Sequence, residues 1–437
     1  MKLPLLLLAA LAGGGAEPDW GRLDAYALDL LQRYIRVESV NPPADTRASA
    51  RLLKSELEKH GIEVRLYPSG PAGQTNLLAR LPGRDRARKP LLLLNHLDVV
   101  PVDRKAWTID PFGGMVKDGF IWGRGALDMK GIGIQHAAAL IALKQAGVTP
   151  NRDILMLSTA DEETGGTYGV LWMAANHFKE IDAEYVLDEG GFGTREILAP
   201  GKLAFGIAVG EKQTAWLRLR AKGTAAHGSQ PIPDNANLIL LKALDRAMAQ
   251  PESRLHPVVD EMIRNLGGKL AENKYTAAIQ KNTITLTTLA AGVGSPPKIN
   301  VIPSASEATL DCRLLPGVNV EEFISEMKAR INDPRVSIEL ASEPSDPGPS
   351  SSRTPLFEAI AGAIRKHHPG AVVTPMLVPH GTDGVKLRAR GMTAYGLTPM
   401  VLDMATSATM HSDAERIPAD EFYKGIRIFY EVLKSEF

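Results

Sequence analysis

The sequence predicts an α/β protein: a mostly parallel sheet with helices on both faces, interrupted by an inserted α+β domain of ferredoxin-like order. Short, continuously apolar runs alternate with helix-type periodicity up to about residue 207, which is typical of buried parallel strands. Beyond that point the strand-like segments alternate strictly between apolar and polar residues, as half-exposed strands do. The first pattern resumes after the Pro/Ser-rich stretch 342–352, so one domain is expected to interrupt another.

Length and charge narrow the function classes. The chain has 437 residues, which suits two or three domains, and 50 basic residues balance 50 acidic ones. A formal net charge of zero argues against a nucleic-acid binder that relies on a global positive field. The only cysteine, Cys312, excludes an internal disulfide.

The N-terminus has the pattern of a removable secretory leader. Lys2 precedes a Leu/Ala-rich run over 3–11, and small residues follow it. The run is too short to span a bilayer as a helix. The sequence therefore predicts a signal peptide at 1–16, export to the periplasm or the medium, and no membrane anchor in the mature chain.

The elements of the outer domain follow in order. Helix-spaced leucines and tyrosines predict helices within 19–60. Helical patterns also predict helices at 131–147 and 168–178. Apolar runs predict strands at 76–81, 91–95, 154–159 and 185–187. A further helix is expected at 355–366. The predicted parts of this domain are 17–207 and 345–437.

The inserted domain is expected over 208–344. Alternating segments predict strands at 216–221, 283–289 and 307–314, with helices at 235–250 and 320–331. This order of strands and helices is typical of a ferredoxin-like unit. A polar stretch at 251–281 interrupts it and is expected to be helical; the sequence gives it no role.

A histidine and an aspartate follow the second apolar run. His96 and Asp98 are two residues apart, so an extended chain places them on one face at the carboxyl end of the strand. Open α/β sheets bind their ligands at this end. A metal-binding imidazole needs its other N–H held, and a carboxylate can do this. A histidine that is merely hydrogen-bonded is the alternative.

Two further clusters carry acidic residues. Asp128 stands in a Gly-rich segment that resembles a dinucleotide loop only weakly, and by itself it reads better as a helix cap. Asp161, Glu162 and Glu163 directly follow the run at 154–159. Neighbouring carboxylates repel each other, so a cation is one reason to hold them there, and a solvated acidic turn is the alternative.

The recurrence of such residues at strand ends is more informative than any one cluster. Asp188 and Glu189 end the run at 185–187, and His411 lies near the C-terminus. Two histidines with several carboxylates suit zinc or a similar divalent ion.

At this point the chain resembles a known family. The matching stretches are NHLDVVP, GRGALDMKG, DEETGG, LDEGG, GTAAHGSQP, NVIPSASEATLDCRLLPG and HSDAERI, which run from about residue 90 to 417. They are similar to those of the dinuclear-zinc aminoacylase/carboxypeptidase family. This family also includes glutamate carboxypeptidase and acetylornithine deacetylase/succinyl-diaminopimelate desuccinylase. The LDEGG stretch and the long insertion make the aminoacylase/carboxypeptidase S branch the most similar.

The resemblance implies a site with two zinc ions, for which Co²⁺ or Mn²⁺ are possible substitutes. Its implied ligands are His96, Asp128, Glu163, Glu189 and His411. Asp128 would bridge both ions and form a cis bond to Met129, and Asp188 is the alternative to Glu189. Asp98 would orient His96. Glu162 would be the general base that takes a proton from a zinc-bridging water.

The resemblance also implies how the substrate is held. His227 would enter the active site of a second subunit, so the inserted domain would be a lid through which a homodimer forms. The implied substrate contacts are Arg313, Asn300, Gly381 and Thr382. The implied activity is hydrolysis of an amide bond in a small peptide or an N-acyl amino acid, as a metallocarboxypeptidase, dipeptidase or aminoacylase. The alternative is an exported zinc- or peptide-binding protein without turnover.

Overall fold

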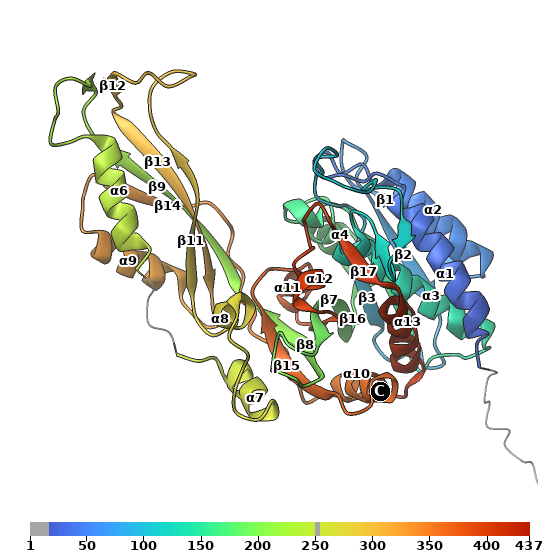
Figure 1. Ribbon diagram of the computed structural model, residues 1–437. Helices are drawn as coiled ribbons and strands as arrows, with labels where there is room; N and C mark the ends of the chain where they lie inside the picture. Colours follow the sequence, from blue (N-terminus) through green and yellow to red (C-terminus); the bar gives the residue numbers. More distant parts are fainter. Residues whose placement is uncertain (1–16, 250–253) are drawn as a thin grey trace, which may run out of the picture. The chain divides into compact units, whose positions relative to one another are not determined.

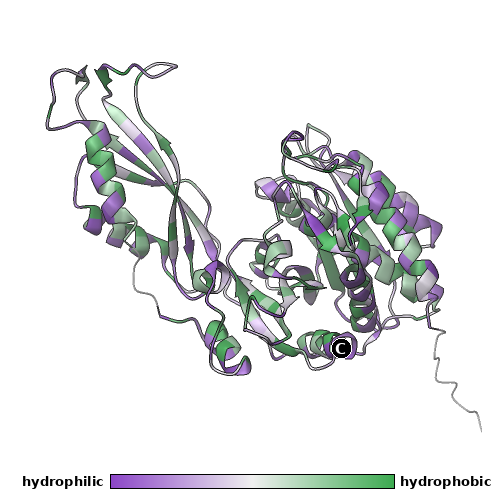
Figure 2. Cartoon of the chain, in the orientation of Figure 1, coloured by the Kyte–Doolittle hydropathy of each residue, from purple (hydrophilic) through white to green (hydrophobic). Residues whose placement is uncertain are grey.

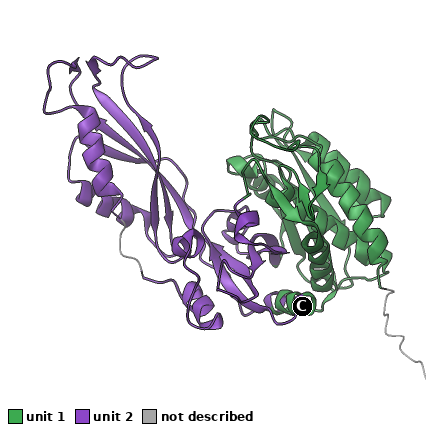
Figure 3. Ribbon diagram, in the orientation of Figure 1, with its two compact units in different colours: residues 1–184, 358–367, 409–437 green, residues 185–357, 368–408 purple. Residues whose placement is uncertain are grey.

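A computed structural model describes residues 17–249 and 254–437 (Figure 1). The predicted leader at 1–16 lies outside these described residues. The chain forms two compact units, one of residues up to 184 with 358–367 and 409–437, the other of residues 185–357 and 368–408 (Figure 3). The α/β class is confirmed. These two units are compact parts of the chain and do not test the domain boundaries inferred from the sequence, which stay predictions.

Four strands form the sheet of the first unit, in the order β1 (Glu63–Pro68), β2 (Thr75–Leu81), β6 (Ile154–Thr159) and β3 (Leu91–His96). β3 and β6 run parallel, from Leu91 opposite Ile154 to His96 opposite Thr159. Both are buried along their whole length, as their continuous apolar runs predict. The register brings the carboxyl ends of the two strands to the same edge. A small second sheet pairs β4 (Met115–Lys117), β5 (Phe120–Trp122) and β17 (Arg416–Pro418).

The helices of this unit are α1 (Trp20–Ile35), α2 (Arg47–Lys59), α3 (Gly131–Gln145), α4 (Val170–Asn176), α5 (Phe178–Ile181) and α13 (Ala419–Lys434). α3 is apolar on every side and buried from Gly131 to Leu143, because α1 and α13 pack against it. α10 (Pro355–His367) follows the Pro/Ser-rich stretch, as expected. Among the described helices, none is both long and apolar enough to cross a membrane.

The second unit begins with β7 (Tyr185–Thr194), β8 (Ala204–Glu211), β15 (Val372–Val378) and β16 (Thr393–Val401). β7 pairs parallel with β16, and β15 pairs parallel with β8. The predicted end of the strand at residue 187 is wrong. β7 continues through Asp188 and Glu189, because Gly191 and Gly396 have no side chain where the backbones of Gly206 and Glu189 pass.

The inserted α+β layer contains an antiparallel sheet of β11 (Thr283–Ala290), β13 (Ala305–Leu314), β9 (Gln213–Lys222) and β14 (Val336–Leu340). This strand order is that of a ferredoxin-like unit. α6 (Ala236–Ala247) and α9 (Val320–Ile331) cover one face of the sheet, and α6 shows both polar and apolar residues in Figure 2. The stretch at 251–281 is helical as predicted, with α7 (Pro257–Asn265) and α8 (Lys274–Ile279).

Remaining short elements complete the second unit. They are β10 (Ala226–His227), β12 (Val301–Ile302), α11 (Gly384–Arg388) and α12 (Met404–Ser407).

Candidate metal centre

The centre lies in the first unit, at the edge where β3 and β6 end. His96 is the last residue of β3, and β6 leads through Asp161 into a short 3₁₀ turn, Glu162–Thr164. A one-turn segment, Ala126–Lys130, supplies Asp128. His411 comes from the C-terminal part of the same unit. Segments far apart in the sequence therefore meet at the carboxyl edge of parallel strands.

The ring of His96 is fixed in one orientation. Its Nδ1 lies 2.9 Å from the main-chain oxygen of Asp98, and its Nε2 lies 2.9 Å from Oδ1 of Asp128. A carbonyl oxygen only accepts, so Nδ1 carries the proton. A neutral ring would then turn the Nε2 lone pair toward a carboxylate. A positive charge between these two atoms, a second ring proton or a metal ion, is required.

Asp128 stands between two histidines. Its Oδ2 lies 2.9 Å from Nε2 of His411, which is also 3.4 Å from Oε2 of Glu163. Burial alone would raise the pKa of Asp128, but hydrogen bonds with His411 and His96 bring it far below its usual value. Hydrogen bonds with Asp128, and then with Glu163, raise the pKa of His411 to about 10. The peptide bond from Asp128 to Met129 is cis, as the family resemblance implies.

Glu163 gives the strongest sign that a cation belongs here. Burial first, and then the charge of Asp128, raise the pKa of its carboxyl. Its Oε1 is buried and has no hydrogen-bond partner among the described residues. One ligand atom each of His96, Asp128 and Glu163 lies within 4.8 Å of the others. Two oxygen donors and one imidazole nitrogen at this spacing fit a divalent ion such as zinc.

Asp98 contacts both His96 and the turn that carries Glu162 and Glu163. Its Oδ1 lies 3.6 Å from Nδ1 of His96, and its carboxylate accepts the main-chain N–H groups of Glu162 and Glu163, each at 3.2 Å. Burial opposes its charge, yet the nearby His96 ring and the hydrogen bond from Asn41 lower the pKa of Asp98 overall. Asp98 therefore connects the end of β3 to the turn that carries the two glutamates.

The three consecutive carboxylates after β6 have different surroundings. Asp161 adopts a left-handed φ of 71° and accepts hydrogen bonds from the Thr164 hydroxyl and the Tyr168 N–H, at 3.1 Å for the latter. It therefore shapes the turn. Glu163 reaches the buried cluster, while Glu162 stays half-buried beside it.

Asp188 and Glu189 lie in β7 of the second unit, and both are buried. Oδ2 of Asp188 accepts the N–H of Gly384 at 2.7 Å, so one of its oxygens is engaged within its own unit. Burial and the charge of Asp383 raise the pKa of Asp188 to about 7. A Cβ at position 384 would lie 3.0 Å from Oδ2 of Asp188, which explains a glycine there. Which of the two carboxylates binds metal stays a prediction.

His227 and Asn300 meet at one end of the inserted layer. His227 pairs with Val301 in a two-residue ladder, and Gly228 N donates to the Asn300 oxygen at 2.7 Å. Both side chains are exposed, and Nδ1 of His227 lies 2.7 Å from the Ser229 hydroxyl.

Arg313 lies near the other end of β13, eight residues beyond its start at Ala305. Its guanidinium pairs with Asp311 at 2.7 Å and donates to the Thr214 hydroxyl, also at 2.7 Å. Thr214 is the neighbour nearest to a Cβ built at Gly381, at 3.9 Å. The structure thus groups Arg313 with the 381–384 loop. Roughly 26 Å of extended strand separates Arg313 from the start of β13, and His227 pairs with Val301 before that start.

Thr382 is buried in the same loop. Its hydroxyl donates to Oε1 of Glu211 at 3.1 Å and accepts the N–H of Gly384 at 3.2 Å. Glu211 is in turn paired with Arg388 at 2.5 Å. The loop is therefore held by hydrogen bonds within its own unit.

Three residues of the centre escaped the sequence analysis. Asn41 donates to Asp98 at 2.7 Å and to Asp161 at 3.2 Å, and is placed there by the bridge between Val40 and Val99. Arg124 and Glu415 form a buried ion pair beside Asp128. Arg124 lies in the stretch GRGALDMKG and Glu415 in HSDAERI, so their place in the family motifs could have pointed to them. Asn41 has no comparable signal, because a loop asparagine before two prolines reads as a turn.

Known proteins resemble this chain along most of its length. A sequence profile of peptidase family M20/M25/M40 matches residues 92–435. Aminoacylase-1A of Rattus norvegicus is 28% identical over 94% of this chain and 95% of its own. A probable carboxypeptidase S-like protein of Dictyostelium discoideum is 28% identical over 82% of this chain and 74% of its own.

The fold is also found among solved structures. An M20 family metallo-carboxypeptidase from Sulfolobus solfataricus superposes with a TM-score of 0.73, at 21% identity, over 93% of this chain and 98% of its own.

Proposed function

Because the chain belongs to peptidase family M20/M25/M40, we propose that it is a zinc-dependent hydrolase of amide bonds in N-acyl amino acids or small peptides. The observation that carries the proposal is the buried group of His96, Asp128 and Glu163, with His411 on the second oxygen of Asp128. Burial and mutual repulsion disfavour the negative charges of these carboxylates, and a bound divalent cation would compensate them. The aminoacylase and carboxypeptidase relatives support this substrate class.

The residues present would suit two divalent ions, with Asp128 among the ligands of each. His96 faces one oxygen of Asp128, and His411 faces the other with Glu163 beside it. Glu189 enters as a further ligand from the family resemblance. Bound zinc supplies Lewis-acid chemistry: it lowers the pKa of water toward neutrality and polarises a carbonyl oxygen.

Glu162 is the residue that moves the proton. Asp98 accepts the main-chain N–H of Glu162, and the Glu162 side chain is half-buried beside the cluster. In hydrolysis a bond forms between the water oxygen and the amide carbon, and the C–N bond breaks. Glu162 takes the proton that the water loses and gives it to the leaving amine.

Arg313 and the 381–384 loop are proposed to bind the substrate carboxylate. A guanidinium offers five donors, and Arg313 spends three of them on Asp311 and Thr214. Gly381 lies near Thr214, which Arg313 contacts, and the main-chain N–H groups of Gly381 and Thr382 are the proposed donors of the loop, since the Thr382 hydroxyl donates to Glu211. A carboxypeptidase or dipeptidase and an aminoacylase all need such a site, because in each substrate the residue released as the amine carries a free carboxylate.

The position of His227 supports a homodimer. It pairs with Val301, before the start of β13, and Arg313 lies roughly 26 Å of strand beyond that start, so one copy of the layer does not bring both to one substrate. A second copy would supply His227 and Asn300 to the site. Light scattering of the purified protein measures the mass, and a monomer at assay concentration would contradict the dimer.

Export is tested separately, by fractionating cells that express the full-length chain.

Metal removal tests the main proposal. We expect a chelator to abolish hydrolysis of an N-acyl amino acid and dipeptide panel, and Zn²⁺ or Co²⁺ to restore it. Elemental analysis of the same samples counts ions per chain. Turnover that survives in metal-free protein contradicts the function. Zinc binding without turnover of any panel member would instead favour the non-catalytic binding protein.

A further inference from the structure

A buried ion pair joins the two loops that carry Asp128 and His411. Nη1 of Arg124 lies 2.6 Å from Oε2 of Glu415, although the residues are 291 positions apart in the chain. Glu415 is 0% and Arg124 is 1% exposed. Burying both charges removes them from water, so their hydrogen bonds must be nearly complete.

Glu415 holds the loop of Asp128 by its main chain. Its Oε1 accepts the N–H groups of Leu127 at 2.9 Å and of Asp128 at 3.0 Å. Its own carbonyl oxygen accepts the N–H of Gly123 at 3.0 Å. The segment from Gly123 to Asp128 is therefore folded around one carboxylate, which sets where the Asp128 side chain starts.

Arg124 holds the loop of His411 in the same way. Its Nη2 donates to the carbonyl oxygen of His411 at 3.3 Å, and its guanidinium lies 5.4 Å from the Trp107 ring. His411 has a φ of 60°, in the left-handed region that residues other than glycine rarely adopt. Such a conformation persists only when the surroundings hold it.

We propose that Arg124 and Glu415 are positioning residues that set the spacing between Asp128 and His411, and thereby the metal affinity of the site. This inference rests on the proposed metal-dependent function. Stability alone does not call for a buried ion pair, since apolar side chains of similar volume serve as well. The pair instead contacts the main chain of both ligands, and partners of metal ligands commonly set affinity.

A second buried arginine provides a matched control. Arg152 is also 1% exposed, pairs with Glu184 at 2.6 Å, donates to two carbonyl oxygens and lies 5.1 Å from the Phe437 ring. Arg124→Met and Arg152→Met each remove a buried guanidinium with its ion pair, carbonyl contacts and ring contact. Both are expected to lower the melting temperature, Arg124→Met by more, because Glu415 is buried while the Glu184 side chain is 44% exposed. Only Arg124→Met is expected to weaken Zn²⁺ binding, by about 10- to 100-fold, in a chelator competition on folded, metal-free protein. The visible spectrum of the Co²⁺ form is expected to change in the same variant only.

A double variant covers failure to fold. Arg124→Met with Glu415→Gln removes both charges, while an amide oxygen still accepts the N–H groups of Leu127 and Asp128. It is expected to fold and to bind Zn²⁺ as weakly as the single variant. If either variant has the same Zn²⁺ affinity and Co²⁺ spectrum as Arg152→Met, the inference is overturned, while the proposed function still stands. A wild-type protein that binds no Zn²⁺ overturns the proposed function, and the inference with it.

Discussion

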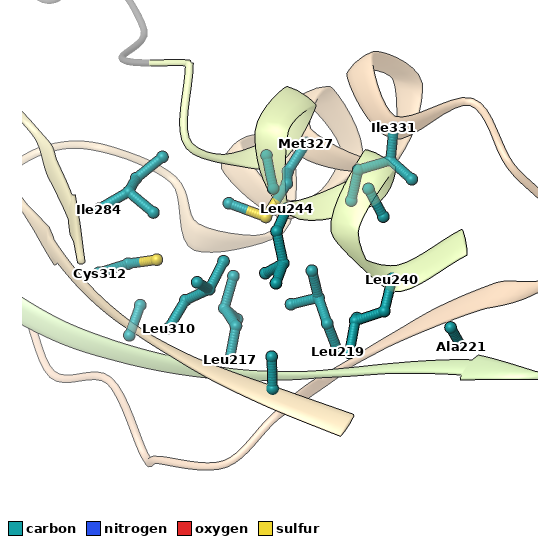
Figure 4. Close-up of a cluster of buried hydrophobic side chains, with 14 of the residues drawn as sticks. Leu217, Leu219, Ala221, Leu240, Leu244, Ile284, Leu310, Cys312, Met327 and Ile331 are labelled. Carbon is teal, nitrogen blue, oxygen red and sulfur yellow. The ribbon is translucent and has the colours of Figure 1, made fainter. Parts of the chain in front are cut away.

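The candidate metal centre of the first unit and the core under the four-stranded sheet of the second unit bury very different side chains. The centre packs His96, Asp98 and Asp128, which are 1%, 0% and 8% exposed. The core beneath β9 and β13 packs aliphatic residues against α6 and α9 (Figure 4). Leu217, Leu310 and Cys312 are 0% exposed there. The first region buries charge at an energetic cost, and the second buries only apolar surface.

This difference separates function from stability. A buried apolar side chain stabilises the fold and has no chemistry to perform. Buried carboxylates with shifted pKa values destabilise unless a cation compensates them, and so they indicate a functional site. Substitutions in the two regions should therefore change different measurements.

The largest effect is expected from Glu162→Gln. The amide cannot take a proton from water, so kcat should fall by about 10²- to 10⁴-fold. Zinc content and melting temperature should stay near those of the wild type, because Glu162 is only half-buried. Steady-state kinetics with elemental analysis measures both. Glu58→Gln, on the exposed face of α2, is the control; full activity in the Glu162 variant would exclude it as the base.

Leu310→Ala should show the opposite profile. Leu310 is fully buried, and truncating such a leucine lowers the free energy of unfolding by about 2–5 kcal/mol. Zinc affinity and kcat of the folded protein should not change. Leu289→Ala is the matched control, since Leu289 on the neighbouring strand is 53% exposed. Denaturant unfolding monitors the loss; equal stability of the two variants would contradict the assigned core.

The sequence predicted the two regions to different depths. Apolar runs and strict alternation located β3, β6, β9 and β13, because a strand's burial pattern is written in its own residues. The continuation of β7 was missed, since Asp188, Glu189 and two glycines read as a strand end. The pairing of Arg124 with Glu415 was out of reach for another reason. Nothing local records a contact between residues 291 positions apart.

A smaller effect should appear in the pH dependence of stability. Lys212 is 1% exposed, and its ammonium donates to two carbonyl oxygens and the Thr283 hydroxyl at 2.7–3.0 Å. Burial, and then the charge of Arg313, lower the pKa of Lys212 to about 7. An unfolded lysine titrates near pH ~10.4. Between these values the unfolded chain binds more protons, so the Lys212 contribution makes the free energy of unfolding rise with pH.

Lys212→Met should remove that rise. Denaturant unfolding of wild type and variant between about pH 7 and 10 measures the difference in slope. Lys222→Met, at an exposed position at the end of β9, should keep the wild-type slope. Parallel curves for wild type and Lys212→Met would show that the ammonium stays charged when buried.

The smallest change concerns Cys312, the only cysteine of the chain, which lies in the apolar core (Figure 4). Burial raises the pKa of its thiol to about 12, so at pH 8 almost none is present as the reactive thiolate. Labelling by a thiol reagent must therefore wait for the core to open, and its rate reports on the second unit alone. We expect Leu310→Ala to accelerate labelling and metal removal to leave it unchanged. Absorbance with a chromogenic disulfide follows the reaction, with Cys312→Ser as the blank. Faster labelling after metal removal would show that the charged centre and the apolar core are energetically coupled, and the separation drawn between them would then fail.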